Sequence, residues 1–176
     1  MPDRVRPKVW IVRAANISEV LQKRAIGVGW STYRNVQELT GRAEFDRVVA
    51  AERQQNVGLE SAAQYQAFGR QLFQFVREKS VDDYILTPIK LTRTVLIGRV
   101  LGDYRYDEML FFKEEYLHPH VREIEWLGEI SRDEFPSSLL IQLNRPPTII
   151  PTDASAREIY ALITERPWRG RETANA

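Results

Sequence analysis

The sequence predicts an α+β domain built on a small, curved, mostly antiparallel sheet or open barrel with flanking helices. Three observations support this fold class. The apolar pattern has a period of two near the N-terminus, a helical period between residues 42 and 79, and a period of two again from residue 81 to 130. Strands, then helices, then a run of strands is the order expected of an α+β domain rather than of a doubly wound parallel sheet.

Composition limits the possibilities further. With 176 residues, 43% of them hydrophobic, the chain is predicted to form one domain over residues 1–166, followed by a flexible tail at 167–176. The net charge of +1 means that any nucleic-acid surface must be a local patch. Cysteine is absent and no apolar run matches a membrane span or a signal peptide, so a soluble cytoplasmic protein without a membrane partner is expected.

Two strands and a short helix are predicted at the N-terminus. Residues 8–14 (KVWIVRA) alternate and are rich in β-branched side chains, which is typical of a strand. Ser18 is predicted to cap a helical turn over 18–25. Residues 26–30 (IGVGW) resemble a second strand, in which the alternate glycines indicate a close approach of backbone or ligand.

Two helices follow, over residues 42–53 and 61–79. In the second, aromatic and aliphatic side chains recur at the helical period, and Ser61 with Gln64 forms a capping box. Helical spacing is what core packing requires, so this aromatic face is assigned to the core rather than to a cofactor pocket.

The C-terminal half alternates again. Three segments are predicted strands: 83–90, 93–102 and 121–130. A short helix is expected near 136–143, and Asp153 or Ser155 should begin a last helix that ends before Pro167.

Signs of catalysis are scarce. His118 and His120 flank a proline, but a third ligand at a fixed spacing is missing, so a solvated loop is favoured over a metal site. The sequence contains neither a Gly-x-Ser-x-Gly elbow nor a phosphate-cradling loop. No catalytic residue, metal or cofactor is predicted, and the chain is expected not to be an enzyme.

One tyrosine-bearing strand leaves two roles open. If the strand from residue 95 continues through Gly102, Tyr104 and Tyr106 lie on the same side as Leu96 and Val100. The tyrosines then either close the core or line a slot for a flat ligand. Composition alone favours the core, because tyrosine suits a half-buried position with a solvated hydroxyl.

Five segments, in order, resemble the N-terminal domain of bacterial Mrr-type modification-dependent restriction endonucleases, a domain similar to the PUA, EVE and YTH group of small barrels. They are 10–14 (WIVRA), 26–30 (IGVGW), 72–88, 97–108 (IGRVLGDYRYDE) and 121–136. Two positions depart from the family pattern, because Ala15 and Asp82 stand where it has glycine. No nuclease constellation is found, so the resemblance implies a reading domain whose nuclease is attached or separate.

The resemblance implies a module that flips a modified, methylated base of duplex DNA into an aromatic cage and targets a restriction or phage-defence effector. Stacking on an aromatic side chain contributes about 1–3 kcal/mol per base, which offsets part of the flipping energy. The predicted cage consists of Trp30, Tyr104 and Tyr106. The pocket is completed by Gly29, Thr87 and Asp103.

Phosphate contacts are expected from basic residues because phosphates carry most of the affinity for DNA. The candidates are Lys90, Arg93, Arg99 and Arg105. Arg13 lies inside an apolar strand and either holds a carboxylate that stabilises the fold or faces the pocket. Trp10 and Trp126 are expected in the core rather than in the pocket.

Two other functional classes stay open. An RNA-binding module of the same barrel group would bind single strands without flipping a base out of a duplex. A protein-interaction domain would use the tyrosines only as core.

Overall fold

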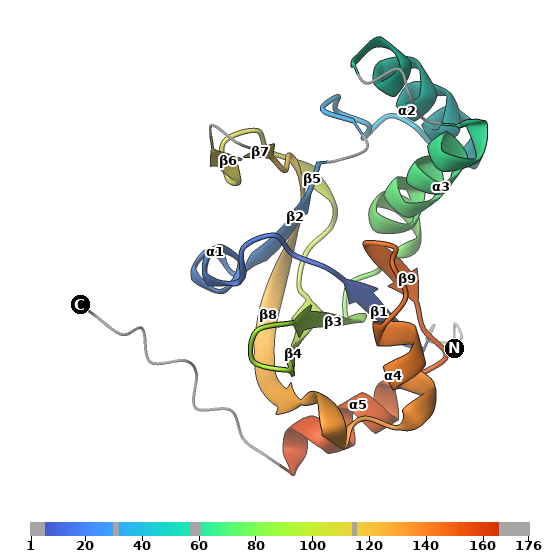
Figure 1. Cartoon of the computed structure of the whole chain (residues 1–176). Coiled ribbons are helices and arrows are strands. Elements are labelled where there is room, and N and C mark those ends of the chain that lie inside the picture. The colour runs from blue at the N-terminus through green and yellow to red at the C-terminus, as the bar shows by residue number, and fades with distance from the viewer. Residues whose placement is uncertain (1–5, 30–31, 57–60, 114–115, 166–176) are drawn as a thin grey trace, which may run out of the picture. The chain divides into compact units, whose positions relative to one another are not determined.

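The computed structural model describes residues 6–29, 32–56, 61–113 and 116–165 (Figure 1). The chain divides into two compact units, which are described separately. The first unit contains Met1–Arg13, Asp82–Val100 and Ile124–Ala176, and the second contains Ala14–Val81 and Leu101–Glu123. The assignment of residues 1–166 to one domain stays a prediction, and the predicted tail lies outside the described residues.

The first unit is built on a mixed sheet. Its strands are β1 (Val9–Val12), β3 (Tyr84–Ile89), β4 (Thr94–Val100), β9 (Ile149–Pro151) and the part of β8 (His120–Ser131) from residue 124 onward. The order is β8-β4-β3-β1-β9, with β1 and β3 parallel and the other pairs antiparallel. A register shift between Ile97 and Gly98 bends the ladder. The predicted α+β class with a curved, mostly antiparallel sheet is therefore confirmed.

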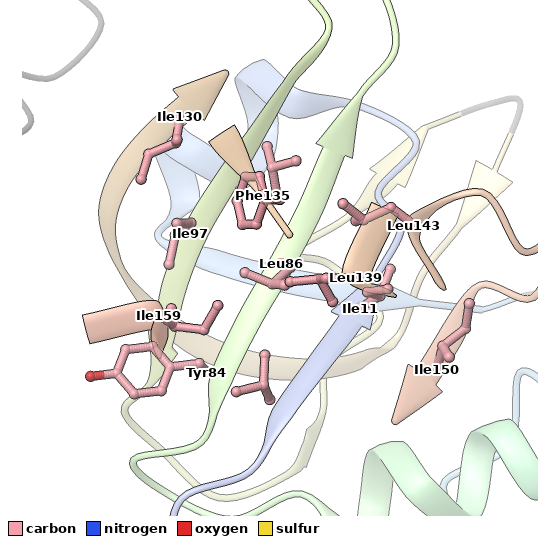
Figure 2. Packing of buried hydrophobic residues seen from close by; sticks show 12 residues of the cluster. Ile11, Tyr84, Leu86, Ile97, Ile130, Phe135, Leu139, Leu143, Ile150 and Ile159 are labelled. Atoms are coloured by element: carbon pink, nitrogen blue, oxygen red, sulfur yellow. The ribbon is translucent and has the colours of Figure 1, made fainter. Parts of the chain in front are cut away.

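The core of this unit lies between one face of the sheet and two helices, α4 (Ser137–Leu143) and α5 (Ala156–Thr164). Figure 2 shows Ile11, Leu86 and Ile97 of three strands gathered with side chains from both helices. These helical partners are Leu139, Leu143 and Ile159. Alternate side chains of these strands share one face of the sheet, and burying the apolar side chains of that face drives the helices onto it.

Trp10 belongs to the same unit and is buried, as predicted. Its indole N–H donates to Asp83 Oδ2 at 2.8 Å, and the Lys8 backbone N–H donates to Asp83 Oδ1 at 2.8 Å. Trp126 is also buried, and its ring occupies the space beside Gly98, where a Cβ atom would lie 2.7 Å from Trp126 Cε3. Both tryptophans therefore pack in the core.

The ends of the helices in the first unit are satisfied by specific side chains. Ser155 caps α5 in a capping box with Glu158, which confirms one of the two predicted starts. Arg13 donates to the carbonyl oxygens of Leu143 at 2.8 Å and Arg145 at 2.5 Å, and also to that of Pro147. Arg13 thus binds main-chain carbonyls at the end of α4, which is neither the carboxylate partner nor the pocket-facing position left open by the sequence.

The second unit contains three α-helices among its described residues. These are α1 (Ile17–Lys23), α2 (Arg42–Asn56) and α3 (Ala62–Phe73), which continues into a π-helical turn, η1 (Gln74–Glu78). The two long helices and the Ser61–Gln64 capping box are confirmed. The prediction of Ser18 as a cap was wrong, because the Asn16 side chain accepts the Glu19 N–H at 3.2 Å and starts the helix earlier. No helix in the described parts of the chain has both the length and the apolar character needed to cross a membrane.

Short strands complete the second unit. β2 (Ala25–Val28) and β5 (Arg105–Tyr106) both pair with the start of β8, while β6 (Phe112–Lys113) and β7 (Tyr116–Leu117) pair with each other. The expected continuous strand through Gly102 was wrong, because β4 ends at Val100 and β5 is a separate strand. At the break, the Leu101 N–H donates to the Glu123 carbonyl at 2.9 Å, and the two tyrosines belong to β5 and the loop before it rather than to β4.

Gly27 of β2 and Gly29 just after it accommodate the protein's own chain. A Cβ atom at Gly29 would lie 1.9 Å from the Leu117 carbonyl oxygen, and one at Gly27 would lie 2.6 Å from the Phe111 ring. Of the two possibilities left open by the sequence, close approach of protein atoms therefore accounts for these glycines.

Candidate functional site

Three aromatic side chains of the second unit form a contiguous group, called here the aromatic cluster: Tyr104, Tyr106 and His120. The pairing of β5 with β8 places Tyr106 opposite His120. The Tyr104 ring stacks on the imidazole with centroids 5.9 Å apart, and the Tyr106 ring meets it edge-on at 5.7 Å. The structure thus brings two of the three predicted cage residues together around a histidine.

His120 is held in one protonation state. It is fully buried, and its Nε2 lies 2.8 Å from the carbonyl oxygen of Thr32. A carbonyl can only accept, so Nε2 carries the hydrogen and Nδ1 accepts from the Tyr104 hydroxyl at 2.9 Å. Burial lowers the pKa of His120 to about 4, so the ring is neutral at neutral pH. The expectation of a solvated loop around this histidine was wrong.

Tyr104 forms the inner layer of the aromatic cluster. Its side chain is buried, and desolvation raises the pKa of its hydroxyl to about 12, an effect partly offset by a hydrogen bond with the Val36 backbone. A protonated, buried phenol that donates to His120 supports the packing of this unit. Tyr104 can back a binding surface, but most of its ring is already covered.

Tyr106 forms the outer layer, and its hydroxyl contacts the main chain of Tyr33. The Tyr106 hydroxyl lies 2.6 Å from Glu108 Oε1 and also contacts the carbonyl oxygen of Tyr33. Burial is the main cause that raises the pKa of Tyr106, and the hydrogen bond with Glu108 and the charge of that carboxylate raise it further. Tyr33 is 50% exposed, so this side of the group offers aromatic surface to solvent.

Glu52 of α2 holds the segment that leads to Tyr33. It accepts the Thr32 hydroxyl and, through Oε1, the Tyr33 N–H at 2.8 Å. The backbone at 32–33 is therefore anchored both to α2 and, through the Thr32 carbonyl, to His120. The preceding residue pair includes Trp30, which lies outside the described residues, so its place in the cage stays a prediction.

The other predicted pocket residues have different surroundings. Asp103 is exposed in the loop before Tyr104. Thr87 is fully buried in β3 of the first unit, and its hydroxyl donates to the Val12 carbonyl at 2.8 Å. Its hydrogen bond therefore serves the sheet of that unit.

Two of the predicted phosphate ligands are bound by carboxylates. Arg99 Nη2 lies 2.6 Å from Glu125 Oε2, which raises the pKa of Arg99. Arg105 Nη1 lies 3.4 Å from Glu123 Oε1 and its Nη2 lies 3.8 Å from Asp107. A phosphate would have to displace these carboxylates.

Lys90 and Arg93 lie at the turn between β3 and β4, and both are exposed. Arg93 Nη2 lies 3.3 Å from Asp133 Oδ1, with both side chains 73% exposed. An exposed pair of this kind contributes about 0–1 kcal/mol, because water screens it. This turn is therefore the more accessible of the two basic regions.

Arg122 is a structural residue that the sequence analysis missed. It is buried and donates to the carbonyls of Phe75 at 2.8 Å, Val76 at 3.0 Å and Lys79 at 2.9 Å, and to that of Gly102 at 3.1 Å. These bonds satisfy carbonyls at the end of η1 and join them to the loop after β4.

The alternation of side chains along β8 could have revealed that His120 and Arg122 are buried. His120, Arg122, Ile124 and Trp126 occupy the buried register of that strand. Extending the period of two backwards from Trp126 would have placed both polar side chains inside.

Among the described residues, no group of three or more histidine, aspartate or glutamate side chains is arranged to hold a metal ion.

A family model described as "Domain of unknown function (DUF8426)" matches residues 12–142, and the chain belongs to this family. Among solved structures, the Mmi1 YTH domain in complex with RNA is similar over 94% of this chain and 85% of that chain, with 12% identity and a TM-score of 0.47. Protein Atu2648 from Agrobacterium tumefaciens is similar over 90% and 92%, with 11% identity and a TM-score of 0.42. No curated protein sequence matches the chain.

Proposed function

We propose that this chain is a nucleic-acid-binding module that recognises a methylated base in duplex DNA and directs a restriction or phage-defence effector to it. The observation that carries the proposal is the layered aromatic group of the second unit. Its inner layer, Tyr104 with His120, is locked by hydrogen bonds, and its outer residue, Tyr106, contacts the main chain of Tyr33, whose side chain is half-exposed. The sequence resemblance to the reading domain of Mrr-type endonucleases supports the same assignment.

A rigid aromatic surface suits this task on energetic grounds. Swinging a base out of the duplex requires a few kcal/mol, and stacking returns about 1–3 kcal/mol for each aromatic partner. A buried methyl group adds about 0.8 kcal/mol. Discrimination for methylation therefore depends on a preorganised pocket. Two hydrogen bonds support such an arrangement: the Tyr33 N–H donates to Glu52, and His120 Nε2 donates to the Thr32 carbonyl.

The charges beside the outer layer indicate which part of the nucleic acid it meets. Glu108 lies against the Tyr106 hydroxyl and Glu52 lies behind Tyr33. Carboxylates repel phosphates but accept hydrogen bonds from the exocyclic amines of adenine and cytosine. We assign the base to this surface. Lys90 and Arg93, which belong to the first unit, are proposed as phosphate ligands on their charge and exposure alone.

Electrophoretic shifts with matched oligonucleotides test the proposal. Methylated duplex DNA should bind more tightly than the same unmethylated duplex, and both more tightly than single-stranded RNA. Preferential binding of RNA would assign the chain to an RNA-binding module instead. Absence of any nucleic-acid binding would leave the protein-interaction class.

Trp30 provides a sharper test of the cage. Trp30→Ala should weaken binding of methylated DNA by about 1–3 kcal/mol, the contribution of one stacking partner, while the melting temperature stays unchanged. Tyr160→Ala, on an exposed face of α5, is the matched control and should alter neither. A large drop in melting temperature, with a loss of about 3–5 kcal/mol in the free energy of unfolding, would instead show that Trp30 is a core residue.

A further inference from the structure

The turn between β3 and β4 carries an unusually exposed apolar side chain. Leu91 is 98% exposed, and its neighbours Lys90, Thr92 and Arg93 are exposed as well. We call residues 90–93 the hairpin tip. Single apolar residues on a surface are common, but this one stands at the end of a hairpin between two cations.

Hydrogen bonds hold the hairpin tip in one conformation. Thr94 donates to Glu129 Oε1 at 2.6 Å, so its hydroxyl oxygen accepts from the Thr92 hydroxyl, also at 2.6 Å. Arg93 adopts a left-handed backbone conformation with φ of 53°, and its carbonyl accepts the Arg132 N–H at 2.9 Å. The backbone that presents Leu91 to solvent is thus anchored to β8 and to the turn that follows it.

The charges of the hairpin tip match a phosphate backbone. Lys90 is exposed at its first position, and the Arg93 guanidinium makes a solvent-screened contact with Asp133. Exchanging Asp133 for a phosphate would retain a charge-assisted hydrogen bond to the guanidinium. An apolar side chain between two such cations is the pattern found where proteins insert a wedge into a base step and hold the flanking phosphates.

We propose that Leu91 is a wedge that inserts into the base stack of duplex DNA, while Lys90 and Arg93 bind the phosphates on either side. This inference rests on the proposed function, since it requires a duplex ligand. Insertion removes the leucine side chain from water and stabilises an unstacked base step, from which a base leaves the helix more readily.

The test compares Leu91→Ala with Ile141→Ala on a methylated duplex that contains a fluorescent purine analogue next to the methylated base. Ile141 is a matched control, because it is also an exposed aliphatic residue of the first unit, on α4. Wild-type protein should raise the fluorescence, which reports unstacking. Leu91→Ala should remove that rise and weaken duplex binding by about tenfold, corresponding to the apolar surface lost. Ile141→Ala should match the wild type, and Leu91→Phe should retain the signal.

The outcomes separate the wedge from the proposed function. If wild-type protein binds the duplex but Leu91→Ala equals it in affinity and fluorescence, the wedge is overturned and the proposed function stands. An equal loss of affinity for single-stranded DNA would also overturn the wedge, because no stack is opened there. Failure of the wild-type protein to bind the duplex would overturn both. Thermal melting of each variant confirms that the exposed side chain is not needed for folding.

Discussion

The two ends of β4 lead to regions with opposite properties. Before the strand, all four residues of the hairpin tip are exposed, and the Arg93 guanidinium makes a solvent-screened ion pair. After it, Tyr104 is buried and bonded to a histidine that is itself buried and bonded to a carbonyl. Both regions are candidates for nucleic-acid contact, but they differ in what else depends on them.

The exposure of a residue therefore determines whether its substitution is detected mainly as a change in binding or as a change in stability. Substitutions at the hairpin tip should change binding and leave folding intact, because few folded-state contacts are lost. Substitutions in the network around His120 should first change stability, because each leaves a buried polar atom without its partner. Experiments on the two regions therefore need both a binding and a stability measurement.

Removing Arg122 should have the largest effect on stability. Arg122→Met deletes the donor that serves four carbonyls at the end of η1 and in the loop before Tyr104. Leaving those buried acceptors unsatisfied should lower the free energy of unfolding by about 3–5 kcal/mol, measured by urea titration. Arg105→Met, whose guanidinium is partly exposed, should lose about 1 kcal/mol or less. Equal effects would show that the buried hydrogen bonds do not set this region apart.

His120 should make stability depend on pH. Between its ordinary pKa near 6.5 and its folded-state pKa of about 4, the unfolded chain binds a proton that the folded chain does not. Stability should therefore fall by about 2 kcal/mol from about pH 7 to pH 5 through this residue.

Urea titrations of His120→Gln at pH 7 and pH 5 test this prediction. The variant should lack the decrease of about 2 kcal/mol in the free energy of unfolding that His120 contributes between these pH values. His118→Gln is the control. Burial also lowers the pKa of His118, so this variant removes a comparable titrating group. Because His120 is still present in it, the pH dependence contributed by His120 should be retained. If the pH dependence of stability is the same in His120→Gln as in the wild type, the buried imidazole is not the titrating group.

The hydroxyl of Tyr104 should matter more than that of Tyr33. Tyr104→Phe leaves His120 Nδ1 buried without its donor and should lower the free energy of unfolding by about 1.5 kcal/mol. Tyr33→Phe changes a half-exposed side chain and should shift it by less than about 0.5 kcal/mol. Thermal melting of both variants measures the difference. A larger effect at Tyr33 would contradict the assignment of Tyr104 to the inner layer.

The hairpin tip should show the smallest effect on stability and a clear effect on binding. Lys90→Ala with Arg93→Ala should change the free energy of unfolding by less than about 0.5 kcal/mol, because both side chains are exposed. Binding to methylated and unmethylated duplexes should weaken alike. The slope of the logarithm of the binding constant against the logarithm of the salt concentration should decrease in magnitude by about one to two, since about one phosphate contact is lost per residue. Unchanged affinity in salt titrations would place the phosphate surface elsewhere.

The amino-acid pattern alone was sufficient for the long helices, the main strands and the fold class. Apolar periodicity is a local property, so it predicted the strand at Val9–Val12, the helices α2 and α3 with the Ser61 cap, and the change to strands after residue 81. Burial of Trp10 and Trp126 followed from their positions within those strands.

Tertiary structure decided the rest, because hydrogen-bond partners come from distant parts of the chain. Arg13 meets carbonyls 130 and 132 positions away, and His120 meets one 88 positions away, so neither role can be read from neighbouring residues. The break after Val100 likewise depends on Glu123 and Arg122 of β8. Local pattern determines which face of a strand is apolar, whereas the folded chain determines which buried polar groups satisfy one another.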